Sequence, residues 1–207
     1  MKLKKIASLA LAGIMAVSML AGCKDGGNNS DVVVDPPVDN SFAAAVNEEL
    51  DDKYTSILSF ESDSSVSNAL NKIATSTEFN LNAGVNGTWD LNNTSVGSTF
   101  RELLDVDNYF SGELFKESTK DKTIATLLIF NGALTEEGLA KAVASELEKY
   151  DSKSYLPLEW NDTANGKRYS YKYSGDMAMT KVTVMNGTQS YYVVAFTIAQ
   201  DVSEIAA

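Results

Sequence analysis

The chain of 207 residues contains no histidine and a single cysteine, Cys23. Without histidine it cannot form a Ser-His-Asp triad, a Cys-His pair or an HExxH zinc site, and one cysteine cannot complete an ordinary structural zinc site. The GxSxG, GxxxxGK[ST], GxGxxG and SxxK patterns are also missing, so no common hydrolase, phosphate-loop or dinucleotide signature is recognisable. A lone cysteine leaves no disulfide within the chain, so the fold must be stabilised by its hydrophobic core. We expect no cofactor and assign no catalytic or metal-binding residue.

Positive charge is scarce as well. The chain carries 17 Lys and Arg against 28 Asp and Glu, a formal net charge of −11. This balance argues against nucleic acid as a partner, because nucleic-acid binding depends on basic residues that neutralise phosphates. It also argues against electrostatic adhesion to anionic lipid head groups. With 44% hydrophobic residues, the chain is nevertheless expected to fold, and its length suits one domain.

The first 22 residues have the three parts of a secretion signal. Lysines occupy positions 2, 4 and 5, and residues 6–20 are almost purely apolar. The small residues Ala21 and Gly22 suit a cleavage site. A transmembrane helix is the alternative, but it needs about 20 apolar residues, and this run is shorter and interrupted by serines. Because residues 1–22 carry three lysines and no acids, their removal changes the formal charge to −14.

The residues Leu20-Ala21-Gly22-Cys23 resemble the lipobox of bacterial lipoproteins: a leucine, two small residues and an invariant cysteine. The resemblance implies cleavage before Cys23, a thioether-linked diacylglycerol on its sulfur and acylation of the new amino group. Two or more acyl chains hold a protein stably on a bilayer, whereas one chain binds only marginally. The expected location is therefore the extracytoplasmic face of a bacterial membrane, at the cell surface or in the periplasm. In the alternative interpretation, Cys23 is a spare thiol of an ordinary secreted protein.

These features predict three segments: a cleaved signal peptide at 1–22, a lipidated cysteine and tether at 23–40, and one globular domain at 41–207. Residues 24–40 are rich in Gly, Asn, Asp and Pro, and as a flexible coil they would reach roughly 20 to 25 Å. The short run Val32-Val33-Val34 could instead add an edge strand to the domain or to a partner.

Apolar periodicity predicts four helices in the domain. The expected ranges are 41–57, a second helix capped by Asp63 or Ser64 and continuing to 73, a short helix near 100–104, and a helix from Thr135 to Tyr150. The run 124–130 has no polar face, as expected of a strand covered on both sides.

Alternation and turn residues predict the strands. Residues 79–85 and 88–91 flank Asn86-Gly87, a strong hairpin signal, and the segments 168–173, 177–185 and 191–199 are separated by Ser174-Gly175-Asp176 and Asn186-Gly187. The predicted fold class is α+β: N-terminal helices and one later helix packed on an antiparallel sheet that ends in a three-stranded C-terminal meander.

The last 70 residues resemble the PsbP/Mog1-like fold, in which a helix precedes strands that end in a glycine, aromatic, Val-Val, Phe-Thr run. Here that run is Gly187, Tyr191-Tyr192, Val193-Val194 and Phe196-Thr197. The run contains no functional motif, so the resemblance implies a fold and no site residues.

Two groups of acidic residues are candidate sites. Glu159 and Asp162 flank Trp160, which suits general acid chemistry or sugar binding; the alternative is a core tryptophan beside two solvated acids. The oxygen ligands in 105–108 suggest calcium, but Phe110 replaces the EF-hand glycine and Lys116 occupies the twelfth position.

Alternation places Tyr169, Tyr171 and Tyr173 on one face of a strand. If the chain turns at Gly175-Asp176, this face continues through Ala178 and Val182 to Tyr191. It is then either packed on the core or exposed as an aromatic platform for sugar rings or a protein.

The leading functional interpretation is a non-catalytic, membrane-anchored binding or accessory domain for an unknown protein or carbohydrate ligand. One alternative is a carboxylate-based enzyme acting on carbohydrate, which requires Glu159 and Asp162 to converge in one pocket. The other is a structural subunit of an envelope complex, which predicts an exposed apolar patch.

Overall fold

The computed structural model describes residues 33–34, 41–76, 88–110, 115–150, 152–184 and 189–206. In this part of the chain seven strands form one sheet: β1 (Val33–Val34), β2 (Phe60–Glu61), β3 (Trp89–Asp90), β4 (Lys122–Asn131), β5 (Glu159–Asp162), β6 (Lys167–Val184) and β7 (Gln189–Ile205). The helices are α1 (Ser41–Glu49), α2 (Asp52–Thr55), α3 (Ser64–Ala74), α4 (Ser95–Leu103), α5 (Glu136–Glu148) and α6 (Ser152–Tyr155).

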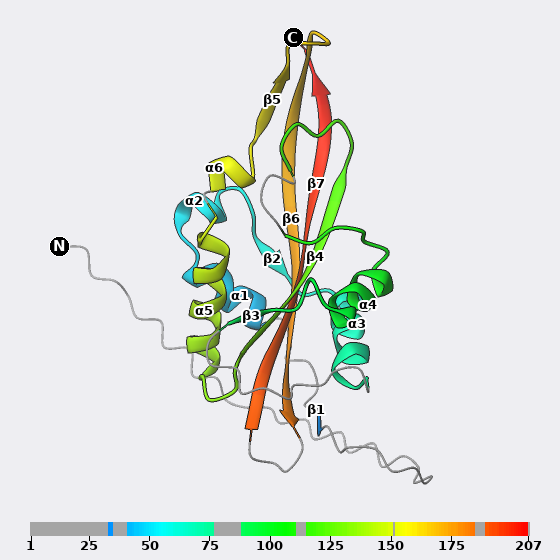
Figure 1. Ribbon diagram of the computed structural model, residues 1–207. Coiled ribbons are helices and arrows are strands. Elements are labelled where there is room, and N and C mark those ends of the chain that lie inside the picture. The colour runs from blue at the N-terminus through cyan, green and yellow to red at the C-terminus, as the bar shows by residue number, and fades with distance from the viewer. Residues whose placement is uncertain are drawn as a thin grey trace, which may run out of the picture.

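Two long strands, β6 and β7, form the axis of the sheet (Figure 1). They pair antiparallel without interruption from Arg168 opposite Ile205 to Val184 opposite Gln189. On one side β7 pairs with β4, and β4 with β3; on the other side, the outer edge of β6 is covered in turn by β5, β2 and β1. Because β2 runs parallel to β6, the sheet is mixed, so the prediction of a wholly antiparallel sheet is wrong in this pair of strands.

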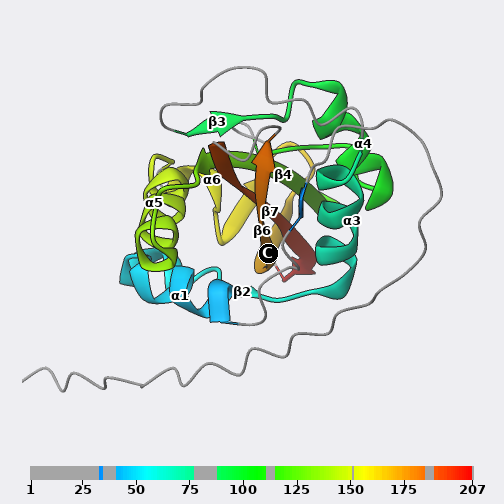
Figure 2. The same ribbon diagram turned by 90° about the horizontal axis from the view of Figure 1, so that it is seen from below.

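The fold is α+β, and helices cover both faces of the sheet. Seen along its length, α1 and α5 lie on one side and α3 and α4 on the other (Figure 2). Even-numbered residues of β4 and β7 pack toward α1 and α5, whereas odd-numbered residues pack toward α3 and α4. Two separate cores therefore account for the absence of a polar face in β4, as predicted for residues 124–130.

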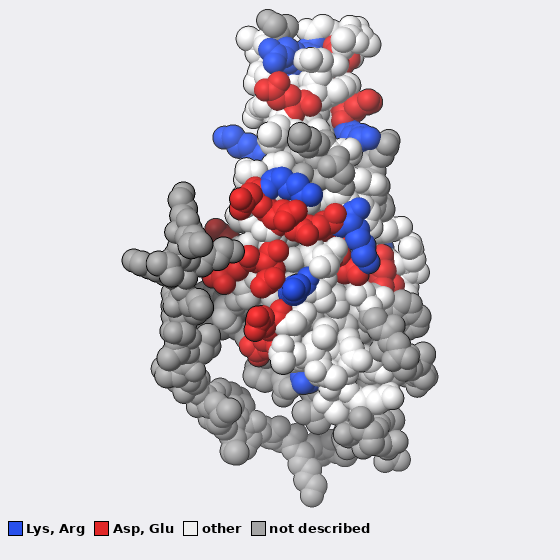
Figure 3. All heavy atoms as spheres, turned by 90° about the vertical axis from the view of Figure 1, so that its left-hand side faces the viewer, with Lys and Arg blue, Asp and Glu red and all other residues white. Residues whose placement is uncertain are grey.

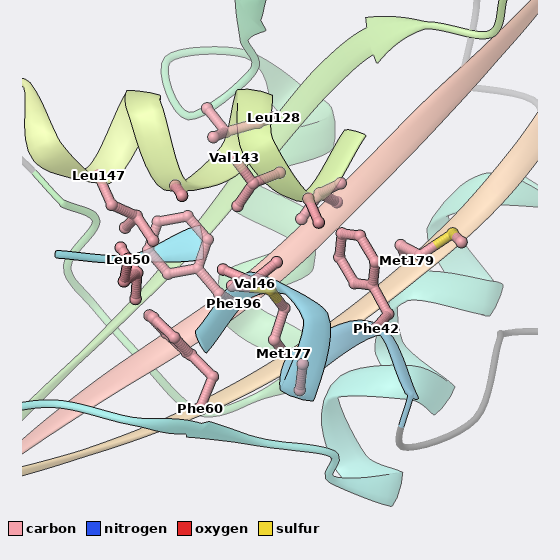
Figure 4. Packing of buried hydrophobic residues seen from close by; sticks show 14 of the residues in the cluster. Phe42, Val46, Leu50, Phe60, Leu128, Val143, Leu147, Met177, Met179 and Phe196 are labelled. Atoms are coloured by element: carbon pink, nitrogen blue, oxygen red, sulfur yellow. The ribbon is translucent and has the colours of Figure 1, made fainter. Parts of the chain in front are cut away.

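The core under α1 and α5 is the larger one (Figure 4). Phe42 and Val46 of α1 and Val143 and Leu147 of α5 pack against the sheet, where Phe196 is 1% exposed. Each fully buried side chain of this size contributes about 1.5 to 3 kcal/mol relative to an exposed one.

The sheet ends in a three-stranded antiparallel meander, as predicted, but its strands are β5, β6 and β7. The predicted turn at Ser174-Gly175-Asp176 is wrong, since these residues continue β6. Gly175 lies opposite Phe60 of β2, and a Cβ at this position would be 2.6 Å from the Phe60 ring. The glycine therefore permits a close approach between two strands and does not mark a turn.

Several helix predictions are confirmed by their caps. Asp63 accepts hydrogen bonds from the backbone N–H groups of Ser65 (2.7 Å) and Val66 (3.1 Å), and Thr135 accepts one from Gly138 N–H (3.1 Å). The single helix predicted over 41–57 is instead divided into α1 and α2. The break allows the Tyr54 hydroxyl to donate to the Leu147 carbonyl (2.9 Å) near the end of α5.

Val33 and Val34 form an edge strand on β6, which confirms the alternative interpretation of this run. The expected turns at Asn86-Gly87 and Asn186-Gly187, and the strand expected over 79–85, lie outside the described residues.

Candidate functional site

The three tyrosines at 169, 171 and 173 do share one face of β6, but that face is buried. Tyr169 and Tyr171 are 7% and 3% exposed. The Trp160 ring stacks on Tyr169, with ring centroids 5.6 Å apart and an interplanar angle of 15°. Of the two arrangements that the sequence left open, the packed one is therefore confirmed and the exposed aromatic platform is wrong.

Two of these tyrosines use their hydroxyl groups inside the molecule. Tyr171 donates to the Ser118 carbonyl (2.9 Å), and Tyr173 donates to the Pro157 carbonyl (2.7 Å) while accepting from Gln200 Nε2 (2.9 Å). Burial raises the pKa of both tyrosines, so both hydroxyls remain protonated donors at neutral pH.

Tyr191 lies on the opposite face of the sheet from the other three tyrosines. It belongs to the core under α3 and α4, together with Ala178 and Val182. Because β6 does not turn at Gly175, Tyr173 and Met177 are an even number of residues apart on one strand and face the same side. The prediction that Tyr191 continues the tyrosine face is therefore wrong.

Glu159 and Asp162 do not converge. The Glu159 carboxylate is exposed and lies 3.1 Å from Arg168 Nη2. Asp162 is 6% exposed and accepts hydrogen bonds from the backbone N–H of Asn165 (3.1 Å) and from its Nδ2 (2.7 Å). Asp162 thus holds the β5–β6 turn, and the pair lacks the shared pocket that a carboxylate-based enzyme would require.

The calcium candidate at residues 105–108 lies beside β4. In the segment 105–108, the Asn108 carbonyl accepts from Ala125 N–H at the edge of β4. Within the described residues, no three His, Cys, Asp or Glu side chains lie close enough together to hold a metal ion. No helix in the same part of the chain is both long and apolar enough to cross a membrane. Cys23 lies outside the described residues.

The structure brings together a different set of side chains, in a cleft of about 240 Å³ between β3, β4 and the C-terminal end of α5. Its apolar floor is formed by Phe110, Leu128, Leu147 and Phe196. The Phe110 ring is held in place by an edge-to-face contact with Tyr150 at 4.6 Å and by its backbone N–H, which donates to Thr126 Oγ1 (3.1 Å). Figure 4 shows Leu147 and Phe196 near each other below α5.

The other lining residues are polar: Thr88, Asp90, Asn92, Thr126, Glu146, Lys149 and Tyr150. The only basic residue among them, Lys149, is paired with Glu146 at 2.5 Å. Burial, and then the nearby negative charge of Asp90, raises the pKa of Tyr150, so its hydroxyl is a protonated donor at neutral pH. Two carboxylates and one paired ammonium leave this lining with a net negative charge.

Asn92 is the most unusual residue of the cleft. It is 1% exposed, its Oδ1 accepts from Leu127 N–H (3.0 Å), and its carbonyl accepts from Arg101 Nη1 (2.9 Å). Its Nδ2, in contrast, has no hydrogen-bond partner. An unpaired buried donor costs about 1 to 3 kcal/mol, and because this Nδ2 is enclosed by protein atoms, the cost falls on the stability of the fold.

No motif in the sequence marks this cleft. Its lining comes from five separate stretches of chain, and in the sequence Asn92 looks like part of a polar turn before α4. Asp90 accepts a hydrogen bond from Asn92 N–H (2.6 Å), and in the sequence it too looks like a turn residue.

Comparison of the chain with protein-family models, with curated proteins and with solved structures finds no match.

Proposed function

We propose that this protein is a lipoprotein anchored through Cys23 to the extracytoplasmic face of a bacterial membrane, and that its domain binds a small molecule in the cleft of Asn92. The lipobox at residues 20–23 supports the anchor. The observation that carries the binding role is a cleft with an aromatic and aliphatic floor and a polar rim.

The lining selects a class of ligand. Rings and aliphatic side chains on the floor suit a ligand with an apolar surface, such as a sugar ring or a small aliphatic amine. The carboxylates of Asp90 and Glu146 accept hydrogen bonds from hydroxyl or ammonium groups, and their charge disfavours anions. The ligand is therefore neutral or cationic.

The enzyme and envelope-subunit alternatives have less support. Glu159 and Asp162 are separated, as described above. Among the described residues, the large apolar side chains that are exposed are Leu103, at the end of α4, and Leu158, directly before β5.

Lipidation is tested on the protein purified from its native membrane. We expect intact-mass analysis to show a chain that begins at Cys23 and carries a diacylglycerol and an acyl group, and Cys23→Ser to move the protein from the membrane to the soluble fraction. A native chain that retains residues 1–22 and has a free Cys23 thiol would refute the anchor.

Binding is tested by blocking the cleft. Thr88→Trp places a large ring in the lining, whereas Thr123→Trp adds the same ring at an exposed position of β4. We expect a neutral sugar or aliphatic amine from a small-molecule panel to raise the melting temperature of the wild type and of Thr123→Trp, but not of Thr88→Trp. Saturation at about 100 times Kd corresponds to roughly 2.7 kcal/mol of stabilisation. Equal shifts in all three proteins, or a preference for carboxylates, would contradict the assignment of this cleft.

A further inference from the structure

The short strand β1 fixes where the N-terminal segment meets the domain. Val33 pairs with Thr183 and Val34 with Val182, close to the end of β6 at Val184. Figure 1 shows β1 at the lower end of the β6–β7 hairpin, and the C-terminus at the opposite end. We call the lower end, formed by residues 181–184 and 189–192, the base, and the upper end, formed by β5 with 167–170 and 203–205, the tip.

Chain length restricts the position of Cys23 relative to these two ends. Cys23 precedes Val33 by ten residues, which span at most about 36 Å and as a flexible coil roughly 16 to 19 Å. Thr183 and Arg168 are fifteen residues apart on β6, which corresponds to roughly 50 Å at about 3.3 Å per residue. While β1 is paired, the sulfur of Cys23 can reach the base but not the tip.

The distribution of charge favours the same orientation. Between residues 177 and 184 and between 189 and 199, the only charged residue is Lys181. The other charged residues of the two long strands lie between the level of Asp176 and the tip: Lys167, Arg168, Lys172, Asp176, Asp201 and Glu204. On the face shown in Figure 3, acidic residues gather across the middle, and few charged residues lie toward the base. An anionic bilayer surface repels acidic groups, so the base is the end that can lie close to it.

We propose that the base of the β6–β7 hairpin faces the membrane, with β1 as the fixed point, and that the tip projects away from it by roughly the length of the sheet. This inference rests on the proposed lipid anchor at Cys23. Pairing of β1 shortens the free tether to residues 24–32 and orients the domain, which a flexible segment of residues 24–40 would not do.

The orientation is tested with a lipid attached chemically, so that the result does not depend on lipidation in the cell. A chain beginning at Cys23 is coupled through its only thiol to a maleimide lipid in vesicles. An azide-bearing amino acid that carries a donor dye replaces either Ala133 or Ala164, both exposed alanines in turns. Ala133 follows Gly132, whose N–H donates to Ser190 O at the base (2.9 Å), and Ala164 lies in the β5–β6 turn at the tip. Acceptor dyes are placed on the lipid head groups.

We expect energy transfer to be at least about threefold stronger from position 133 than from position 164, because the tip lies roughly 50 Å farther away. Equal transfer, or stronger transfer from position 164, would overturn the proposed orientation.

The control changes β1 alone. In Val33→Pro with Val34→Pro, neither residue can donate a backbone hydrogen bond to β6, so the tether lengthens and the contrast between the two positions should shrink at least about twofold. Circular dichroism checks that the domain stays folded. An unchanged contrast in the folded double variant would overturn the role of β1. Native mass analysis that finds Cys23 without lipid would refute the proposed function instead, and the two failures are therefore distinguishable.

Discussion

Replacing Phe196 by alanine is expected to lower the free energy of unfolding by about 3 to 5 kcal/mol. Phe196 lies in the middle of β7, is 1% exposed, and contacts the rings of Phe60 at 5.9 Å and Phe110 at 6.4 Å. These neighbours come from β2 and from the segment between α4 and β4, and paired strands cannot collapse into the cavity that the substitution leaves. Urea denaturation followed by circular dichroism measures the loss.

Two matched variants serve as controls for the loss of stability expected in Phe196→Ala. Leu158→Ala removes a side chain that is 53% exposed and should change stability by no more than about 0.5 kcal/mol. Phe196→Leu retains much of the buried volume and should cost about 1 to 1.5 kcal/mol. A loss below about 1 kcal/mol in Phe196→Ala would show that Phe196 is not packed as described.

The parts of the fold that the sequence predicted are those with local signals. An acceptor side chain followed by apolar residues at helical spacing marked α3 and α5, and an unbroken apolar run marked β4. In each case the residues that determine the element lie within it or directly before it. The end of α1 at Glu49 has no such local signal. It is linked to a distant contact, the hydrogen bond from the Tyr54 hydroxyl to α5.

The continuation of the tyrosine face to Tyr191 was mispredicted because a glycine can occur either in a turn or where two strands approach closely. Ser174-Gly175-Asp176 has the composition of a turn, and a turn there would place Tyr173 and Met177 on different faces. Only contact with Phe60 of β2, which is distant in the sequence, shows that the glycine serves a close approach of strands. Once β6 is continuous, its register with β7 determines the burial of every tyrosine.

The cleft could not be predicted for a related reason. Asp90, Thr126 and Tyr150 have no common spacing or motif, and they meet because β3 pairs with β4 while α5 crosses the same face of the sheet. Neither a composition nor a periodicity signal reports such a meeting of distant segments. The unpaired Nδ2 of Asn92 is likewise a property of the assembled fold alone.

Replacing Tyr171 by serine is expected to cost about 3 to 5 kcal/mol of unfolding free energy, comparable to the loss of a buried phenylalanine. The ring is 3% exposed, and its hydroxyl donates to the Ser118 carbonyl at 2.9 Å, which loses its donor in the variant. An exposed aromatic platform would predict the opposite outcome, a folded protein with near wild-type stability. Chemical denaturation therefore distinguishes the buried arrangement from the exposed platform, the other arrangement that the sequence left open.

Two further variants separate the ring of Tyr171 from its hydroxyl group. Tyr171→Phe keeps the packing and removes only the hydrogen bond, so it should cost about 1 to 3 kcal/mol. Tyr109→Ser removes a partly exposed ring whose hydroxyl donates to Asn93 Oδ1 at 2.8 Å on the surface, and it should cost about 1 kcal/mol or less. The expected order of loss is Tyr171→Ser, then Tyr171→Phe, then Tyr109→Ser. If Tyr109→Ser were as damaging as Tyr171→Ser, burial on β6 would not be the cause, because only Tyr171 lies between the sheet and the segment that contains Ser118.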